Sequence, residues 1–290
     1  MDGVWPVLSG ALAQERRMEV IANNLANVNT PGFKKDFAIF QGMQPIQPEV
    51  LGTRPVVPVP TFAVLDEVKT HFAPGEIRET GEPMDLAING EGFFPVQTPD
   101  GIRYTRNGSF VLNEGQQIVT KNGYLLLSGT DPIVIPAGVL RVDEDGNIGV
   151  LPIEASRAPN EPGAPSIARG TAVLEVGRLI LTRFDDLTRL KKVGDDLYEP
   201  INEVAREILP DGVGVGEPLG QMQTALDVNG NVPFAVGRIR QGALEMSNVN
   251  PVEEMVGMIG VMRMYEAAQN ALQTADEVAG RAANDVGRIG

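Results

Sequence analysis

The sequence predicts an α+β fold, with a helix at each end of the chain and a mostly antiparallel β domain between them. Three observations support this. Apolar residues near both termini recur at alternating spacings of three and four, the period of a helix that buries a narrow stripe against another helix. Short β-prone runs in the middle are separated by Asn-Gly and Asp-Gly dipeptides. The 33 glycines and 22 prolines imply many turns.

These patterns divide the chain into three predicted parts. Residues 1–33 and 243–290 form a terminal-helix domain in which the two helices pair as a coiled coil. Residues 34–70 form an extended arm or linker, because the stretch 41–62 alternates proline with apolar residues and does not suit a helix. Residues 71–242 form the central β domain.

The first helix is expected over residues 4–27. Thr30-Pro31-Gly32 ends it, because proline lacks an amide donor and glycine permits a left-handed turn. Its apolar stripe, in which glutamine is the one polar member, consists of Val4, Val7, Ala11, Gln14, Met18, Ile21, Leu25 and Val28.

Three asparagines lie beside this stripe near the helix end: Asn23, Asn24 and Asn27. Their amides can bond neighbouring backbones and fix the register between subunits, as a buried polar residue does in coiled coils. Solvated or capping asparagines at a helix end explain the same pattern equally well.

The β domain is expected to contain short strands at 86–88, 93–97, 102–105, 110–112 and 124–127, with further runs at 173–184 and 197–198. The turn dipeptides between the earlier runs predict antiparallel hairpins: Asn89-Gly90, Asp100-Gly101, Asn107-Gly108 and Asn122-Gly123. Residues 154–170 are rich in proline, glycine and alanine, which predicts a loop.

The second helix is expected to begin at Pro251. Asn250 can cap it, proline suits the first helical position, and Glu253 and Glu254 fall in the first turn, where the helix dipole favours acids. Its stripe consists of Met258, Val261, Tyr265, Ala268, Leu272, Ala275, Ala279, Ala282, Val286 and Ile289.

The alanines in the second stripe bury little area and permit close helix approach. Such a stripe is weak alone, and this favours assembly with other subunits over the alternative of a simple pair within one chain. We therefore predict a subunit interface made of the ten residues of the second stripe together with Val7, Ala11, Met18, Ile21, Asn23, Asn24, Leu25, Asn27 and Val28.

Composition excludes several functional classes. A net charge of −14 argues against a nucleic-acid partner and favours solubility before assembly. The chain has no cysteine, so it has no disulfide, thiolate nucleophile or cysteine metal site. No apolar run of about 20 residues suits membrane insertion. The N-terminus lacks the basic and apolar regions of a cleaved secretory signal.

No catalytic, cofactor or metal site is predicted. His71 is the single histidine, with no second imidazole to share a metal, and it is assigned no role. The acidic run at 143–147 resembles the start of a calcium loop whose twelfth position is Glu154, but apolar residues follow it and a hairpin turn fits better. Gly90 and Gly92 precede another strand, so they indicate a tight turn rather than a phosphate cradle.

Four segments resemble bacterial flagellar rod and hook proteins. They are ANNLANVNTPGFK at 22–34, GEPMDLAINGEGFF at 81–94, YTRNGSF at 104–110 and GALEMSNVNPVEEMVGMIGVMRMY at 242–265, and they follow the order of that family. The length is similar to that of rod subunits rather than the larger hook protein. Residues 1–34 and 72–94 look most like a proximal-rod subunit, with a distal-rod subunit as the next best match.

The resemblance implies a structural, non-enzymatic subunit of the basal-body rod, the shaft that transmits torque from motor to hook. It implies export by the flagellar type III apparatus without a cleaved signal, and a periplasmic location. The implied partners are other rod subunits and further copies of the chain. The implied architecture places the terminal helices along the inner tube and the β domain outside. The competing class is a soluble β-domain enzyme or glycan-binding protein, against which the carboxylates lack paired spacing and Trp5 lies on the terminal helix.

Overall fold

The computed structural model describes residues 4–43, 62–129, 131–152, 173–184, 186–201, 206–208 and 237–287. The chain divides into two compact units. The helix unit comprises 1–28, 34–71 and 249–290, and the β unit comprises 29–33 and 72–248. Helices lie at both ends and every strand pair between described residues is antiparallel, which confirms the predicted α+β class.

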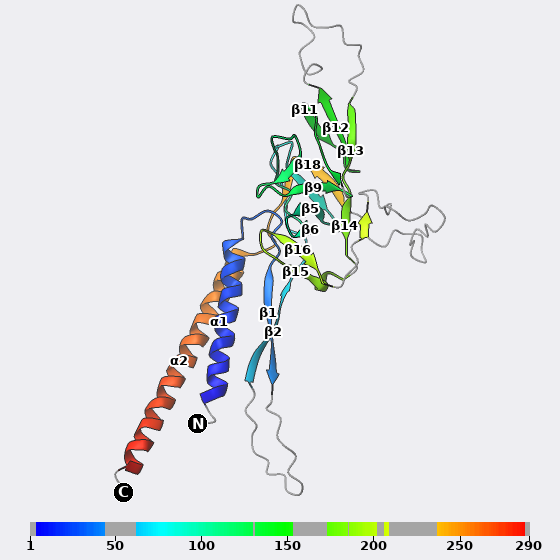
Figure 1. Cartoon of the computed structure of the whole chain (residues 1–290). Helices are drawn as coiled ribbons and strands as arrows, with labels where there is room; N and C mark the ends of the chain where they lie inside the picture. Colours follow the sequence, from blue (N-terminus) through cyan, green and yellow to red (C-terminus); the bar gives the residue numbers. More distant parts are fainter. Residues whose placement is uncertain are drawn as a thin grey trace, which may run out of the picture. The chain divides into compact units, whose positions relative to one another are not determined.

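The helix unit contains two long helices, α1 (Val4–Ala26) and α2 (Pro251–Gly287), which pack side by side and run in opposite directions (Figure 1). The bounds of α1 and the start of α2 agree with the sequence prediction to within one residue. Asn250 caps α2, since its Oδ1 accepts a hydrogen bond from the Val252 amide at 3.1 Å. Pro251 occupies the first helical position, where its missing amide costs nothing.

A β-hairpin completes the helix unit. Its strands β1 (Asp36–Met43) and β2 (Phe62–Thr70) pair from Asp36 opposite Thr70 to Met43 opposite Phe62, with an irregularity between Ile39 and Phe40. These strands occupy both ends of the segment predicted as an extended arm. The proline-rich middle of that segment, 44–61, lies outside the described residues.

The β unit is a set of small antiparallel sheets. Its strands are β3 (Ile77–Glu79), β4 (Leu86–Asn89), β5 (Phe94–Thr98), β6 (Gly101–Thr105), β7 (Phe110–Leu112), β8 (Ile118–Thr120), β9 (Leu125–Ser128), β10 (Asp131–Pro132), β11 (Gly138–Val142), β12 (Asn147–Pro152), β13 (Leu174–Arg178), β14 (Leu181–Arg183), β15 (Leu190–Lys192), β16 (Leu197–Pro200), β17 (Arg206–Ile208), β18 (Arg238–Gln241) and β19 (Ala243–Glu245). A short 3-10 helix, Leu187–Arg189, precedes β15.

The largest sheet has the strand order β15-β16-β6-β5-β9-β8-β7, with β10 paired to β9. A second sheet has the order β11-β12-β13, and three pairs join distant segments: β14 with β17, β18 with β4, and β19 with β3. The last two pairs tie the strands just before α2 to strands more than a hundred residues earlier in the chain.

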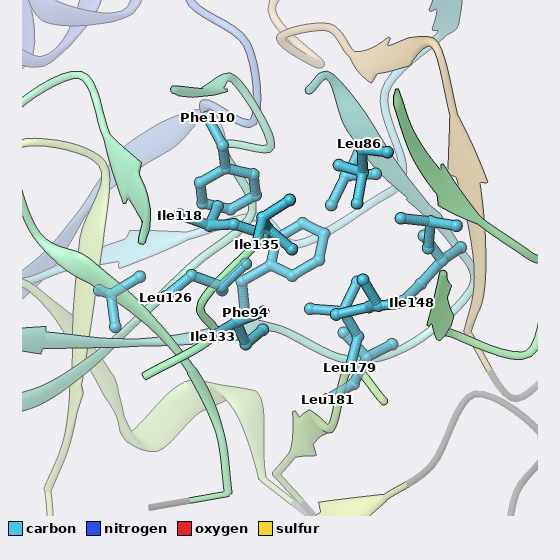
Figure 2. Close-up of a cluster of buried hydrophobic side chains, with 14 of the residues drawn as sticks. Leu86, Phe94, Phe110, Ile118, Leu126, Ile133, Ile135, Ile148, Leu179 and Leu181 are labelled. Carbon is cyan, nitrogen blue, oxygen red and sulfur yellow. The ribbon is translucent and has the colours of Figure 1, made fainter. Parts of the chain in front are cut away.

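Two apolar clusters hold the β unit together. The larger surrounds Phe94 and Ile118, both fully buried, with Phe110 packed edge-on against Phe94 at 5.2 Å between ring centroids (Figure 2). The smaller is aromatic and centres on Phe93 and Tyr198. Such edge-to-face pairs add about 0.5–1.5 kcal/mol beyond the area that they bury.

Only two of the four predicted hairpin turns are hairpins. Asp100-Gly101 joins the paired strands β5 and β6, and Asn122-Gly123 joins β8 and β9. Asn89-Gly90 and Asn107-Gly108 do not join paired strands, because β4 pairs with β18 and β7 pairs with β8. Gly108 is instead needed for close packing, since a Cβ there would lie 1.6 Å from the Leu86 carbonyl oxygen.

The sequence also predicts a turn at 143–147 and another at Gly90 and Gly92. The acidic run at 143–147 is the turn between β11 and β12, as predicted, with the Asn147 amide donating to Asp143 Oδ1 at 2.8 Å. Gly90 and Gly92 have φ angles of 118° and 130°, and the chain bends at Gly90 before the buried strand β5, as the prediction of another strand after these glycines requires. Glu154 and the predicted loop at 154–170 lie outside the described residues.

The described parts of the chain show neither a metal-binding cluster nor a membrane-spanning helix. They contain no cluster of three histidine or acidic side chains arranged to hold a metal ion. Neither described helix is both long and apolar enough to cross a membrane. His71 is exposed, and its backbone amide donates to the Lys35 carbonyl oxygen at 2.8 Å.

Candidate functional site

The apolar stripe of α1 is its least exposed face. Ala11 and Ile21 are buried, whereas the intervening Leu12 and Arg16 are exposed. The other stripe residues whose side chains are described are half-buried: Val7, Gln14, Met18, Leu25, and Val28 in the turn after the helix. Gln14 Oε1 is buried without a hydrogen-bond partner among the described residues.

The stripe of α2 is likewise its least exposed face. Val261 is buried, and the half-buried positions follow the predicted spacing: Met258, Tyr265, Ala268, Leu272 and Ala275. The side chains of Ala279, Ala282 and Val286, and all of Ile289, lie outside the described residues. The stripe also begins one step earlier than predicted, at the buried carboxylate of Glu254.

Asn24 and Glu254 form a polar contact between the helices. Asn24 is 1% exposed, and its Nδ2 donates to Glu254 Oε2 at 3.3 Å. Lys35 Nζ lies 2.5 Å from the other oxygen of the same carboxylate. A buried charge needs such a partner, so this contact fixes one register of α1 along α2.

Asn24 also binds the hairpin. Its Oδ1 accepts the Asp36 amide at 2.9 Å and its Nδ2 donates to the Asp36 carbonyl at 2.8 Å, which is a two-bond bridge to one backbone residue. Thr70 Oγ1 donates to Asp36 Oδ1 at 2.6 Å. One asparagine therefore joins α1, α2 and the start of β1. Asn27 bonds the carbonyl of Asn23 one turn back in the helix, and Asn23 is exposed.

The β unit also contains a buried ionic contact, between Glu245 and Arg106. It is 2% exposed, its Oε2 lies 3.3 Å from Arg106 Nη1, and its Oε1 accepts the Gly75 amide at 3.0 Å. Arg106 also donates to the Gly90 carbonyl and lies over the Phe93 ring. Burial lowers the pKa of the Arg106 guanidinium, and the charge of Glu245 opposes that shift.

Three chain segments of the β unit meet at Glu245. The Gly32 amide donates to the Glu245 carbonyl at 2.7 Å, and the Met246 amide donates to the Glu76 carbonyl at 2.8 Å. Gly32 has φ +73°, and a Cβ there would lie 2.3 Å from the Asn107 amide nitrogen, so only glycine fits. The segments 29–33, 72–76 and 245–248, through which the chain passes between the units, are thus bound to one another inside the β unit.

Asp196, which accepts a hydrogen bond from Asn107 at 3.3 Å, supplies a pH-dependent prediction. Burial raises its pKa, so the ionised form destabilises the fold at neutral pH, and this cost disappears as pH falls below the unfolded pKa of about 3.9. We expect Asp196→Asn to raise the Tm at neutral pH, with a gain that shrinks as pH falls towards 4 and vanishes only below the unfolded pKa. Thermal scans from pH 7 to about pH 3 measure this.

Asp195→Asn is the matched control, because Asp195 is exposed and also has a left-handed φ of 50°. Asparagine tolerates that conformation well, so both variants share any backbone benefit. A gain from Asp196→Asn that did not change with pH, or that Asp195→Asn reproduced, would show that burial of the Asp196 charge is not its cause.

Comparison with known proteins places these features in a family. Three family profiles match: "Flagella basal body rod protein" at 7–34, "Flagellar hook protein FlgE/F/G D1 domain" at 87–150, and "Flagellar basal body rod FlgEFG protein C-terminal" at 240–285. The flagellar basal-body rod protein FlgG of Borreliella burgdorferi is 33% identical, over 98% of both chains. The chain belongs to the flagellar basal-body rod protein family.

Other relatives of this rod subunit carry related names. The basal-body rod protein FlgF of Caulobacter vibrioides is 31% identical over 99% of both chains. The flagellar hook-basal body complex protein FlhO of Bacillus subtilis is 27% identical over the whole of both chains. These relatives make the protein a structural subunit of the flagellar basal body, and they include both the FlgF and the FlgG types. None of these names denotes an enzyme.

The matched family segments contain most of the polar centres described above. The match at 7–34 covers most of α1 and the turn that holds Gly32, and the match at 240–285 covers Glu245, Glu254 and most of α2. Sequence reasoning identified the helix stripes but did not identify Arg106, Glu245 or Glu254 as buried ionic groups. The available signal was an acid within an apolar run, as in ALE at 243–245.

Proposed function

We propose that this rod subunit polymerises through its terminal helices into the shaft that transmits torque from the motor to the hook. The observation that carries the proposal is the register between the helices, which the buried Asn24–Glu254 contact fixes. Transmission of torque requires a stiff connection within each subunit. A buried charge held by Asn24 and Lys35 resists sliding of α1 along α2, because sliding would leave the carboxylate unpaired.

The proposed interface between subunits consists of the interface residues predicted from the sequence. Most of the stripe residues with described side chains are only half-buried within the chain, so part of each remains available to helices of neighbouring subunits in a coiled-coil arrangement. Asn23 and Asn27, which belong to this predicted interface, lie at the C-terminal end of α1. We propose that residues 1–33 and 243–290 mediate polymerisation, that residues 34–70 form an extended arm, and that residues 71–242 form the outer layer of the rod.

The proposed partners are other rod subunits, further copies of the chain and the type III export apparatus. The proposed position is the proximal rod, as the resemblance at 1–34 and 72–94 implies. The distal rod is the second candidate, and the overall identity of 33% to a FlgG protein favours it. We also propose that the chain has no enzymatic or glycan-binding activity. Hydrolase and glycan-array screens of the purified protein are expected to be blank.

Immunogold labelling of a tag inserted at Asn160, in the segment predicted as a loop, tests the proposal in isolated basal bodies. We expect gold on the rod, at its proximal part. Gold on the part of the rod nearer the hook would show that the subunit belongs to the distal rod. Rods that form normally but carry no gold would contradict the proposed role as a rod subunit. A strain without the tag controls for non-specific gold.

A further inference from the structure

The β unit contains a groove of about 540 Å³, formed by β11, β18 and the loop that follows β3. This volume is in the range of ligand-binding clefts. Gln241 on β18 connects the loop to β11. Its Nε2 donates to the carbonyl oxygens of Pro83 at 2.8 Å and Leu140 at 3.0 Å, and its Oε1 accepts the Val142 amide at 3.1 Å. The groove is therefore built into the fold of this unit.

The charged side chains of the groove are mostly basic. Arg141 on β11 and Arg240 on β18 line it, and Glu79 at the end of β3 is the one acid among its described lining residues. In the whole chain acids outnumber bases by 38 to 24. Charges more than about 8 Å away are largely screened at physiological ionic strength, so the nearby arginines decide which ligand the groove attracts. That ligand is anionic.

Arg141 is available to such a ligand. It is exposed, and it forms no hydrogen bond or ion pair with any other residue that the structure describes. Glu144, in the turn after β11, pairs instead with Arg238 at 3.1 Å. A guanidinium presents its donors in a planar fork that matches a carboxylate with two parallel hydrogen bonds. A carboxylate is therefore the group that Arg141 fits.

Arg240 is held only weakly by its partner. It pairs with Glu79, but the two side chains are 55% and 74% exposed, and water screens ion pairs of this kind. An incoming carboxylate can therefore displace Glu79 from Arg240.

Val139 adds an apolar surface beside these cations. It also lines the groove, and it is 42% exposed. It lies two residues before Arg141 on β11, so the two side chains are on the same face of the strand. The groove thus offers two cations and an apolar contact.

We propose that this groove binds an acidic peptide segment of a partner protein. One carboxylate of the peptide bonds Arg141, a second displaces Glu79 from Arg240, and an apolar side chain packs on Val139. The inference goes beyond the proposed function, which assigns the contacts between copies of the chain to the terminal helices. The β unit, in the proposed outer layer of the rod, is left for a different protein.

Isothermal titration calorimetry of the purified full chain with acetyl-Glu-Val-Glu-Val-Glu-amide tests the inference. We expect saturable binding with one peptide per chain. Arg141→Ala is expected to weaken binding about five- to tenfold, because it removes a charge-assisted pair of hydrogen bonds. Glu79→Gln is expected to strengthen binding roughly two- to fivefold, because it removes the competing carboxylate.

Arg78→Ala is the matched control. Arg78 is an exposed arginine next to Glu79 on β3, but its side chain is on the opposite face of the strand and does not line the groove. It removes the same charge as Arg141→Ala and is expected to leave the affinity unchanged. The neutral peptide acetyl-Gln-Val-Gln-Val-Gln-amide is expected not to bind.

Absence of binding by the acidic peptide would overturn the inference. So would equal weakening by Arg78→Ala and Arg141→Ala, a Glu79→Gln variant that binds no more tightly, or inorganic phosphate that binds as tightly as the peptide. Self-association of the free chain that Arg141→Ala abolishes, without peptide binding, would assign the groove to a second copy instead. None of these results bears on the role as a rod subunit, which the labelling of basal bodies tests separately.

Discussion

Replacing Glu245 with alanine is expected to destabilise the β unit by about 3–5 kcal/mol, because it leaves the Arg106 guanidinium buried without a counter-charge. Glu245 is 2% exposed and Arg106 is 8% exposed, so bulk water does not screen the guanidinium in the native fold. The Gly75 amide loses its acceptor at the same time. Urea unfolding followed by tyrosine near-ultraviolet circular dichroism measures the effect, since Tyr104 and Tyr198 lie in the same unit.

Glu79→Ala is the matched control for this prediction. Glu79 pairs with Arg240, but the two side chains are 74% and 55% exposed, and an ion pair of this kind contributes about 0–1 kcal/mol. A second variant, Glu245→Ala with Arg106→Met, removes both buried charges and is expected to recover much of the lost stability. Equal destabilisation by Glu245→Ala and Glu79→Ala would show that the buried Arg106–Glu245 pair does not stabilise the β unit.

The helices and several strands were predictable because their signals are local. Asn250 followed by Pro251 and two glutamates specifies a helix start within four residues, and the structure places the start of α2 there. Asp100-Gly101 predicts its hairpin because β5 and β6 are adjacent in both sequence and sheet. Asn107-Gly108 has the same chemistry but forms no hairpin, because the strand before it, β6, pairs with β5 and β16, whereas the strand after it, β7, pairs with β8.

The two buried ionic contacts were not predictable because their partners are far apart in sequence. Arg106 and Glu245 are 139 residues apart, and Asn24 and Glu254 are 230 residues apart. Even where an acid follows apolar residues, as Glu245 does, a single sequence does not show which partner it meets, and the pairing of β19 with β3 supplies the neighbours of Glu245. The spacing of three and four picks out only one stripe of α2, although Val252, Val256 and Ile259 form a second apolar face.

The second large effect is expected at the centre of the helix unit. Val261→Asp places a carboxylate at a side chain that is 4% exposed, and an unpaired buried charge costs several kcal/mol unless the surrounding structure opens. We expect α1 and α2 to separate, with loss of far-ultraviolet helical signal. Cells carrying the variant are expected to lack complete rods and to be non-motile.

The contrast with Ala267→Asp decides whether the α1–α2 packing, rather than charge on α2 in general, is responsible. Ala267 is exposed six residues later on the same helix, so an aspartate there remains solvated and is expected to leave motility intact. In both variants the near-ultraviolet transition of the β unit should be unchanged, because residues 249–290 belong to the other compact unit. Fully motile Val261→Asp cells would mean that the rod subunit assembles without its helix pair and that the β unit alone carries the contacts between subunits.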